Sequence, residues 1–130
     1  MKTFASAYPL NSKGEIVFPR DQELRKKLFK EKVAHPAHNN LFMLDELAQY
    51  LAEPGDIIID PMAGTGGLMI AAKRGYRIML IELGPYFSEK LVVNRLGFIG
   101  AENITVFPES NCLDVLPSFA GMAQAIIFSP

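Results

Sequence analysis

One glycine-rich stretch of the chain combines residue types that can bind a ligand. It reads Asp60-Pro61-Met62-Ala63-Gly64-Thr65-Gly66-Gly67 and lies between an apolar segment and a segment that can form a helix. Glycines allow the backbone to turn tightly, and the free N–H groups at the start of a helix face such a turn. The carboxylate of Asp60 can accept hydrogen bonds from a cationic or hydroxyl-bearing ligand. The stretch therefore predicts a ligand-binding loop.

A second acidic residue ends the next apolar segment. Glu82 follows Asp60 by 22 residues. In a nucleotide-binding sheet, an acid at this position binds the two ribose hydroxyls. The dinucleotide fingerprint Gly-x-Gly-x-x-Gly does not fit the glycine-rich stretch, which disfavours a dehydrogenase. Together the loop and Glu82 predict a ligand that carries a nucleoside.

The elements that must position these residues alternate along the chain. Short apolar segments predict strands at 56–60, 76–82, 104–107 and 125–128, and helical spacing and stop signals predict helices at 21–32, 40–52, 65–74 and 85–96. The segment 56–60 does not alternate between apolar and polar residues, which is typical of a strand that is buried on both faces. Strands that alternate with helices predict an α/β fold with a parallel, doubly wound sheet.

Length and composition favour one globular domain. The chain has 130 residues, 49% of them hydrophobic, and a single cysteine, which excludes an intramolecular disulfide. We expect an N-terminal arm or cap over 1–39 and a domain over 40–130.

No apolar run approaches the roughly 18 residues of a membrane span, so we expect a cytoplasmic protein with no membrane partner. His35 and His38 have no carboxylate pair near them, so we predict no metal site.

The charge is distributed unevenly. The formal net charge is −1, which argues against binding nucleic acid by bulk electrostatics alone. Between Arg20 and Lys32, however, six cations stand against three acids. This run indicates either a solvated helix face or a patch that contacts phosphates.

The glycine-rich stretch also carries a family resemblance. Residues 58–66, Ile-Ile-Asp-Pro-Met-Ala-Gly-Thr-Gly, resemble the cofactor-binding motif of the S-adenosylmethionine-dependent methyltransferases, in the Asp-Pro-x-x-Gly-x-Gly form of the amino-methylating enzymes. Upstream, His35-Pro36-Ala37 is similar to the segment before this motif in N4-cytosine and N6-adenine DNA methyltransferases. Downstream, Phe128-Ser129-Pro130 resembles the start of their catalytic Ser-Pro-Pro-Tyr motif. The resemblance covers about 32–130 and implies the first four or so parallel strands, with flanking helices, of a Rossmann-like class I methyltransferase sheet.

The resemblance implies S-adenosylmethionine as cofactor and assigns residues to it. Asp60, Ala63, Gly64 and Gly66 would line the methionine moiety, Glu82 would bind the ribose, and Asp114 would lie by the adenine amine. The remaining cofactor contacts would come from His35, Pro36, Pro61, Met62, Thr65 and Leu83. Two structural alternatives stay open: Asp114 as the N-cap of a short helix near Val115, and His35-Pro36 as an extended loop.

The same resemblance implies the reaction and its target. A hydroxyl and a backbone carbonyl at Ser129 and Pro130 would accept the hydrogens of an exocyclic amine of DNA, either N4 of cytosine or N6 of adenine. An RNA guanine-N2 methyltransferase is the alternative enzyme, because residues 60–68 also resemble its cofactor loop. A third alternative is a non-catalytic, methyltransferase-like binding subunit.

The catalytic motif breaks off after Pro130. The chain is therefore expected to be a fragment, half of a split enzyme or a self-associating remnant, with a partner chain or a second copy covering the edge of the fourth strand. Because a target-recognition region would be missing, we expect this chain alone to lack sequence-specific DNA methylation.

Overall fold

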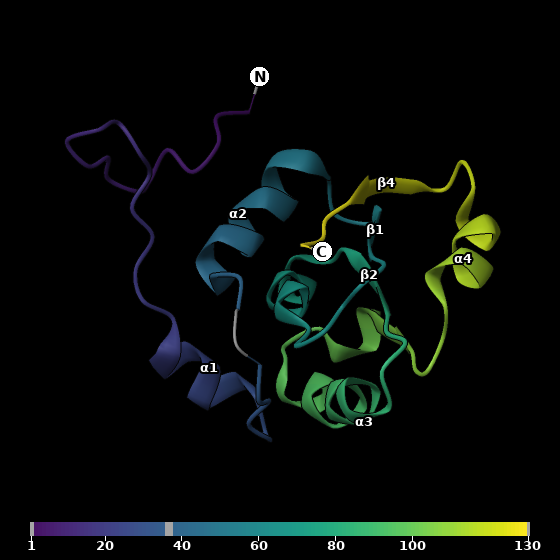
Figure 1. Cartoon of the computed structure of the whole chain (residues 1–130). Helices are drawn as coiled ribbons and strands as arrows, with labels where there is room; N and C mark the ends of the chain where they lie inside the picture. The colour runs from purple at the N-terminus through teal and green to yellow at the C-terminus, as the bar shows by residue number, and fades with distance from the viewer. Residues whose placement is uncertain (1, 36–37, 130) are drawn as a thin grey trace.

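Four parallel strands form the centre of the molecule (Figure 1). The structure, a computed structural model, describes residues 2–35 and 38–129. The strands are β1 (Ile57–Asp60), β2 (Arg77–Ile81), β3 (Ile104–Phe107) and β4 (Ala123–Ile126), in the order β3-β2-β1-β4. Helices flank this sheet, so the predicted α/β class is confirmed, and the topology is consistent with a partial Rossmann-like fold.

The helices are short, and several turns are of the 3-10 type. The α-helices are α1 (Gln22–Leu28), α2 (Leu41–Leu51), α3 (Pro85–Asn94) and α4 (Cys112–Val115), and the 3-10 helices of the described residues are η1 (Gly67–Arg74), η2 (Arg95–Gly97), η3 (Ala101–Asn103) and η4 (Leu116–Phe119). The start of α2 follows the sequence pattern, because the side chain of Asn40 accepts hydrogen bonds from the N–H groups of Phe42 and Met43.

Four predicted elements differ from the observed ones. The predicted helix over 85–96 ends at Asn94 and is followed directly by the 3-10 helix η2. The predicted α-helix over 65–74 is the 3-10 helix η1, which starts only after Gly66 in the left-handed region, with φ of 80°. The predicted helix over 21–32 ends at Leu28, because Phe29 becomes extended and packs edge-to-face against Phe98, with ring centroids 5.2 Å apart. The fourth strand was predicted two residues too late, because β4 pairs with β1 only from Ala123 to Ile126.

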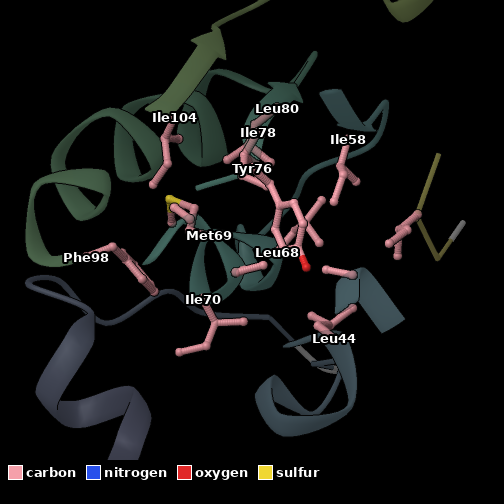
Figure 2. Packing of buried hydrophobic residues seen from close by; sticks show 14 of the residues in the cluster. Leu44, Ile58, Leu68, Met69, Ile70, Tyr76, Ile78, Leu80, Phe98 and Ile104 are labelled. Carbon is pink, nitrogen blue, oxygen red and sulfur yellow. The ribbon is translucent and has the colours of Figure 1, made fainter. Parts of the chain in front are cut away.

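The two faces of the sheet are covered by different crossovers. On one face, a large apolar cluster joins the sheet to α2, η1 and α3, and Figure 2 shows Leu44, Leu68 and Ile78 within it. On the other face, residues of α4 and η4 pack against Ile57 and Ile59 of β1 and their neighbours on β2. Because the strand order reverses between β1 and β4, a crevice is expected at the carboxyl ends of these two strands.

The N-terminal segment lies against α2 and α3. Lys2 donates hydrogen bonds to the carbonyl oxygens of Gln49 and Ala52 at the end of α2. Further along, the fully buried side chain of Asn94 accepts a hydrogen bond from the Glu31 N–H at 2.7 Å and donates one to the Glu31 carbonyl at 3.0 Å. These contacts hold the segment before α2 against the domain.

Within the described residues, no helix has both the length and the apolar character that a membrane crossing requires.

Candidate ligand-binding site between β1 and β4

A cavity of about 420 Å³ lies at the carboxyl ends of β1 and β4. The chain that follows β4 runs back toward α2 (Figure 1) and closes one side of it. The lining residues are His35, His38 and Asn39 before α2; Met43, Leu44 and Leu47 on α2; Asp60, Met62, Ala63, Gly64, Thr65, Gly67 and Leu68 after β1; and Ile127, Phe128 and Ser129 after β4. This volume is in the range of small-molecule binding sites.

Asp60 is the acidic group of this cavity. It ends β1, is 9% exposed, and accepts a hydrogen bond from the Met62 N–H at 3.0 Å. Burial raises the pKa of the Asp60 carboxyl from 3.8 to about 6, and nearby Glu82 adds to the rise, while the Met62 hydrogen bond opposes it. The ionised carboxylate is therefore held in a poorly solvated place, where a cation would stabilise it.

The glycines of the loop have different roles. A Cβ on Gly64, which lines the cavity, would meet only the Met62 carbonyl, at 4.0 Å, so the missing side chain leaves room for a ligand. A Cβ on Gly66 would instead lie 2.4 Å from Leu91 and 2.7 Å from Met69. Gly66 does not line the cavity and is required for the left-handed turn and for packing.

Glu82 connects the glycine loop to the start of α3. Its Oε1 accepts a hydrogen bond from the Gly64 N–H at 2.8 Å, and its Oε2 accepts one from the Gly84 N–H at 2.7 Å. Glu82 therefore lies beside Gly64 but outside the cavity wall. Each carboxylate oxygen retains a further lone pair that can accept a hydroxyl hydrogen.

The segment after β4 contributes a hydroxyl and an aromatic ring. Ser129 and Phe128 both line the cavity, and Phe128 is 49% exposed. The Ile127 N–H donates to the Ile59 carbonyl at 3.0 Å, which fixes this segment beside the end of β1. A hydroxyl, a planar ring and the Asp60 carboxylate therefore converge on one space.

Two histidines form the wall before α2. The rings of His35 and His38 lie 5.9 Å apart, and His35 also lies 5.4 Å from the ring of Phe87. Burial lowers the pKa of His38, and Arg25 and His35 lower it further against an opposing effect of Asp21. His38 is therefore neutral at pH 7. The described ranges contain no group of three or more His, Cys, Asp or Glu side chains able to hold a metal ion.

The structure brings about half of the predicted site residues to the cavity. Those that line it are His35, Asp60, Met62, Ala63, Gly64, Thr65 and Ser129. Pro61, Gly66, Glu82, Leu83 and Asp114 do not line it, and Pro36 and Pro130 lie outside the described residues. The proposed capping role of Asp114 is wrong: the N-cap of α4 is Asn111, whose side chain accepts from the Leu113 N–H, and Asp114 is an exposed residue of the first turn.

Sequence reasoning missed the α2 side of the cavity. Met43 and Leu47 are one helical turn apart and line the cavity together with Leu44. Their spacing predicts that they share one face of a helix. Only the three-dimensional arrangement shows that this face lines the cavity in addition to packing on the core. His38 and Ile127 were missed as cavity residues because their positions depend on how the chain passes over the end of β1.

Compared with known proteins, the sequence matches no family model and no curated protein. The residues that line the cavity combine one buried acid, an open glycine backbone, two hydroxyls and an apolar wall.

Proposed function

We propose that this chain binds S-adenosylmethionine at the β1–β4 cavity and is the cofactor-binding part of a DNA amino-methyltransferase. The observation that carries the proposal is the convergence of Asp60, the open Gly64 backbone and Ser129 on one cavity of about 420 Å³. The site lies where the strand order reverses, which is the usual ligand position in such sheets.

The chemistry of the lining residues fits the cofactor. The ionised Asp60 carboxylate can bind the ammonium group of the methionine moiety, and Gly64 allows close approach to the backbone. Glu82, next to Gly64, has lone pairs for the ribose hydroxyls, and the exposed Leu83 side chain beside it offers an apolar contact for the adenine. The cofactor role of Asp114, on α4, belongs to the same proposal.

The proposed reaction gives Ser129 and Phe128 separate roles. When bound, the cofactor supplies an electrophilic methyl group on a sulfonium. Ser129 accepts a hydrogen bond from the target amine and orients its nitrogen lone pair toward the methyl carbon, while Phe128 stacks on the base. The cofactor, held by Asp60 and the Gly64 backbone, would supply its methyl group to the amine nitrogen, and water would take the amine proton.

Calorimetric titration of the purified chain with S-adenosylmethionine and S-adenosylhomocysteine tests the proposal. We expect both to bind, and we expect Asp60→Ala to weaken each by at least about tenfold, because a charge-assisted hydrogen bond to the ammonium is lost. Asp56→Ala is the matched control, since Asp56 lies just before β1, does not line the cavity, and its side chain accepts a hydrogen bond from the Glu53 N–H. A folded chain, judged by circular dichroism, that binds neither compound contradicts the proposal.

A second candidate function is that of a non-catalytic binding subunit. It is favoured by the position of β4 at the edge of the sheet, where Ile126 is 52% exposed. Such an edge can pair with another chain. Efficient methyl transfer to an oligonucleotide by the chain would contradict the role of a non-catalytic subunit. Methyl transfer to RNA in preference to DNA would favour the other alternative, an RNA guanine-N2 methyltransferase.

A further inference from the structure

A second cavity, of about 480 Å³, lies next to the first. His38 and Thr65 line both cavities, so the two share a wall. The second cavity is otherwise formed by α1 and the segment after it. Phe29 and Val33 give it an apolar floor, and its cations come from Arg25, Lys26 and Lys32.

The cations of this cavity differ in how far they are already neutralised. Arg25 binds the Asp21 carboxylate at 3.1 Å and the Asn39 carbonyl, and its guanidinium lies 5.5 Å from the centroid of the Phe29 ring. Lys26 has only an exposed pair with Glu23 at 3.2 Å, which contributes little. Lys32 forms no ion pair within the part of the chain that the structure describes.

Among residues 2–35 and 38–129, no carboxylate lines this cavity. The chain as a whole has a formal net charge of −1, yet the run from Arg20 to Lys32 holds six cations and three acids. Positive charge is therefore concentrated at one place on an otherwise acidic chain, and it surrounds an aromatic floor. Cations that surround an aromatic surface are the combination that binds nucleotides of a single strand, through phosphate contacts and base stacking.

We propose that the second cavity binds the nucleotide next to the target nucleotide of a nucleic-acid strand. Its phosphate is held by Lys26 and Lys32, and its base packs against the Arg25 guanidinium and the apolar lining of Phe29 and Val33, while the target base enters the first cavity across the wall formed by His38 and Thr65. The part of this inference that concerns the target base rests on the proposed function. The cavity itself is assigned on its charge and shape.

The test is binding of a fluorescently labelled 12-nucleotide single strand, followed by anisotropy at several salt concentrations. We expect the double variant K26E/K32E to weaken binding at least about tenfold and to lower the slope of log K against log salt by about 0.7, because the contact with one phosphate is lost. The matched control is K27E/K30E, which changes the charge equally in the same run at two exposed lysines outside the cavity. We expect the control to lose clearly less affinity.

Equal losses in the two double variants would overturn the proposal, because the lysines would then act only through diffuse charge. Failure of the unmodified chain to bind the strand would overturn it as well. DNA and RNA strands of the same sequence identify the sugar, and lysine-dependent binding of either supports the cavity. If calorimetry detects no cofactor while binding still depends on Lys26 and Lys32, the proposed function fails and the nucleic-acid site stands.

Discussion

The Asp60 carboxylate ends β1 in a place where folding favours its protonated form. Its pKa is raised from 3.8 to about 6, mainly by burial, so the folded chain binds this proton more tightly than the unfolded chain does. The contribution of Asp60 to the free energy of unfolding therefore falls as pH rises from about 4 to about 6. A ligand cation beside the carboxylate would offset this loss of unfolding free energy. Without a ligand, the ionised Asp60 destabilises the folded chain.

We expect Asp60→Asn to raise the free energy of unfolding at pH 7.5 by about 1 to 3 kcal/mol, because one pKa unit corresponds to about 1.4 kcal/mol. The amide retains an oxygen that can accept from the Met62 N–H but carries no charge. The gain should become small near pH 4. Urea unfolding at pH 4.5 and 7.5 measures it. An equal gain at both pH values would contradict this assignment of the buried charge.

At the scale of elements, Asn94 joins α3 to the segment before α2. Its side chain makes two hydrogen bonds with the backbone of Glu31, and Lys90 on the same helix binds the Glu31 carboxylate at 2.8 Å. The hydroxyl of Tyr86 also accepts a hydrogen bond from the Ala34 N–H. Three residues of α3 therefore position the segment that forms the floor of the second cavity.

We expect Asn94→Ala to lower the free energy of unfolding by about 2 to 4 kcal/mol, because two hydrogen bonds are lost and the N–H and carbonyl of Glu31 are left without partners. Hydrogen exchange at the Glu31 amide should also become faster, since the segment opens locally. Asn103→Ala is the control, because the Asn103 side chain makes no hydrogen bond with other described residues. Unchanged exchange at Glu31 in Asn94→Ala would exclude this role.

The same elements show what the sequence could predict and what it could not. All four residues of the strand Ile57–Asp60 are buried, whereas Ile104–Phe107 is an edge strand on which Thr105 is exposed. The local apolar pattern is sufficient to find both. The end of α1 at Leu28 depends on a distant contact between Phe29 and Phe98, which no local pattern contains. Asp60 and Glu82 were predicted as site residues from their positions at strand ends. Glu82, however, accepts hydrogen bonds from the Gly64 and Gly84 N–H groups and lies beside the cavity without lining it.

At the scale of the whole molecule, β4 has β1 on one side and no strand on the other within the described chain. Ile126 on this strand and the nearby Met122 are both more than half exposed. An edge strand with exposed apolar side chains favours association with another chain.

We expect light scattering to show a molar mass that rises with concentration in the micromolar range, and Ile126→Lys to shift the chain toward the monomer. A lysine on an edge strand opposes pairing by its charge and hydration. Ile99→Lys is the control, because Ile99 is also exposed but lies after η2, outside β4. If the chain is monomeric at all concentrations, or if both variants dissociate it equally, the β4 edge is not the contact surface.

The first cavity arises from the order of the strands, because the crossovers beside β1 and β4 leave on opposite faces of the sheet. Met43 and Phe128 line the cavity without belonging to either apolar cluster, and Phe128 is half exposed. At these two positions, ligand preference can change without a change in the core. They are therefore suited to directed evolution, in which the chain could be adapted to new ligands while its architecture is inherited unchanged.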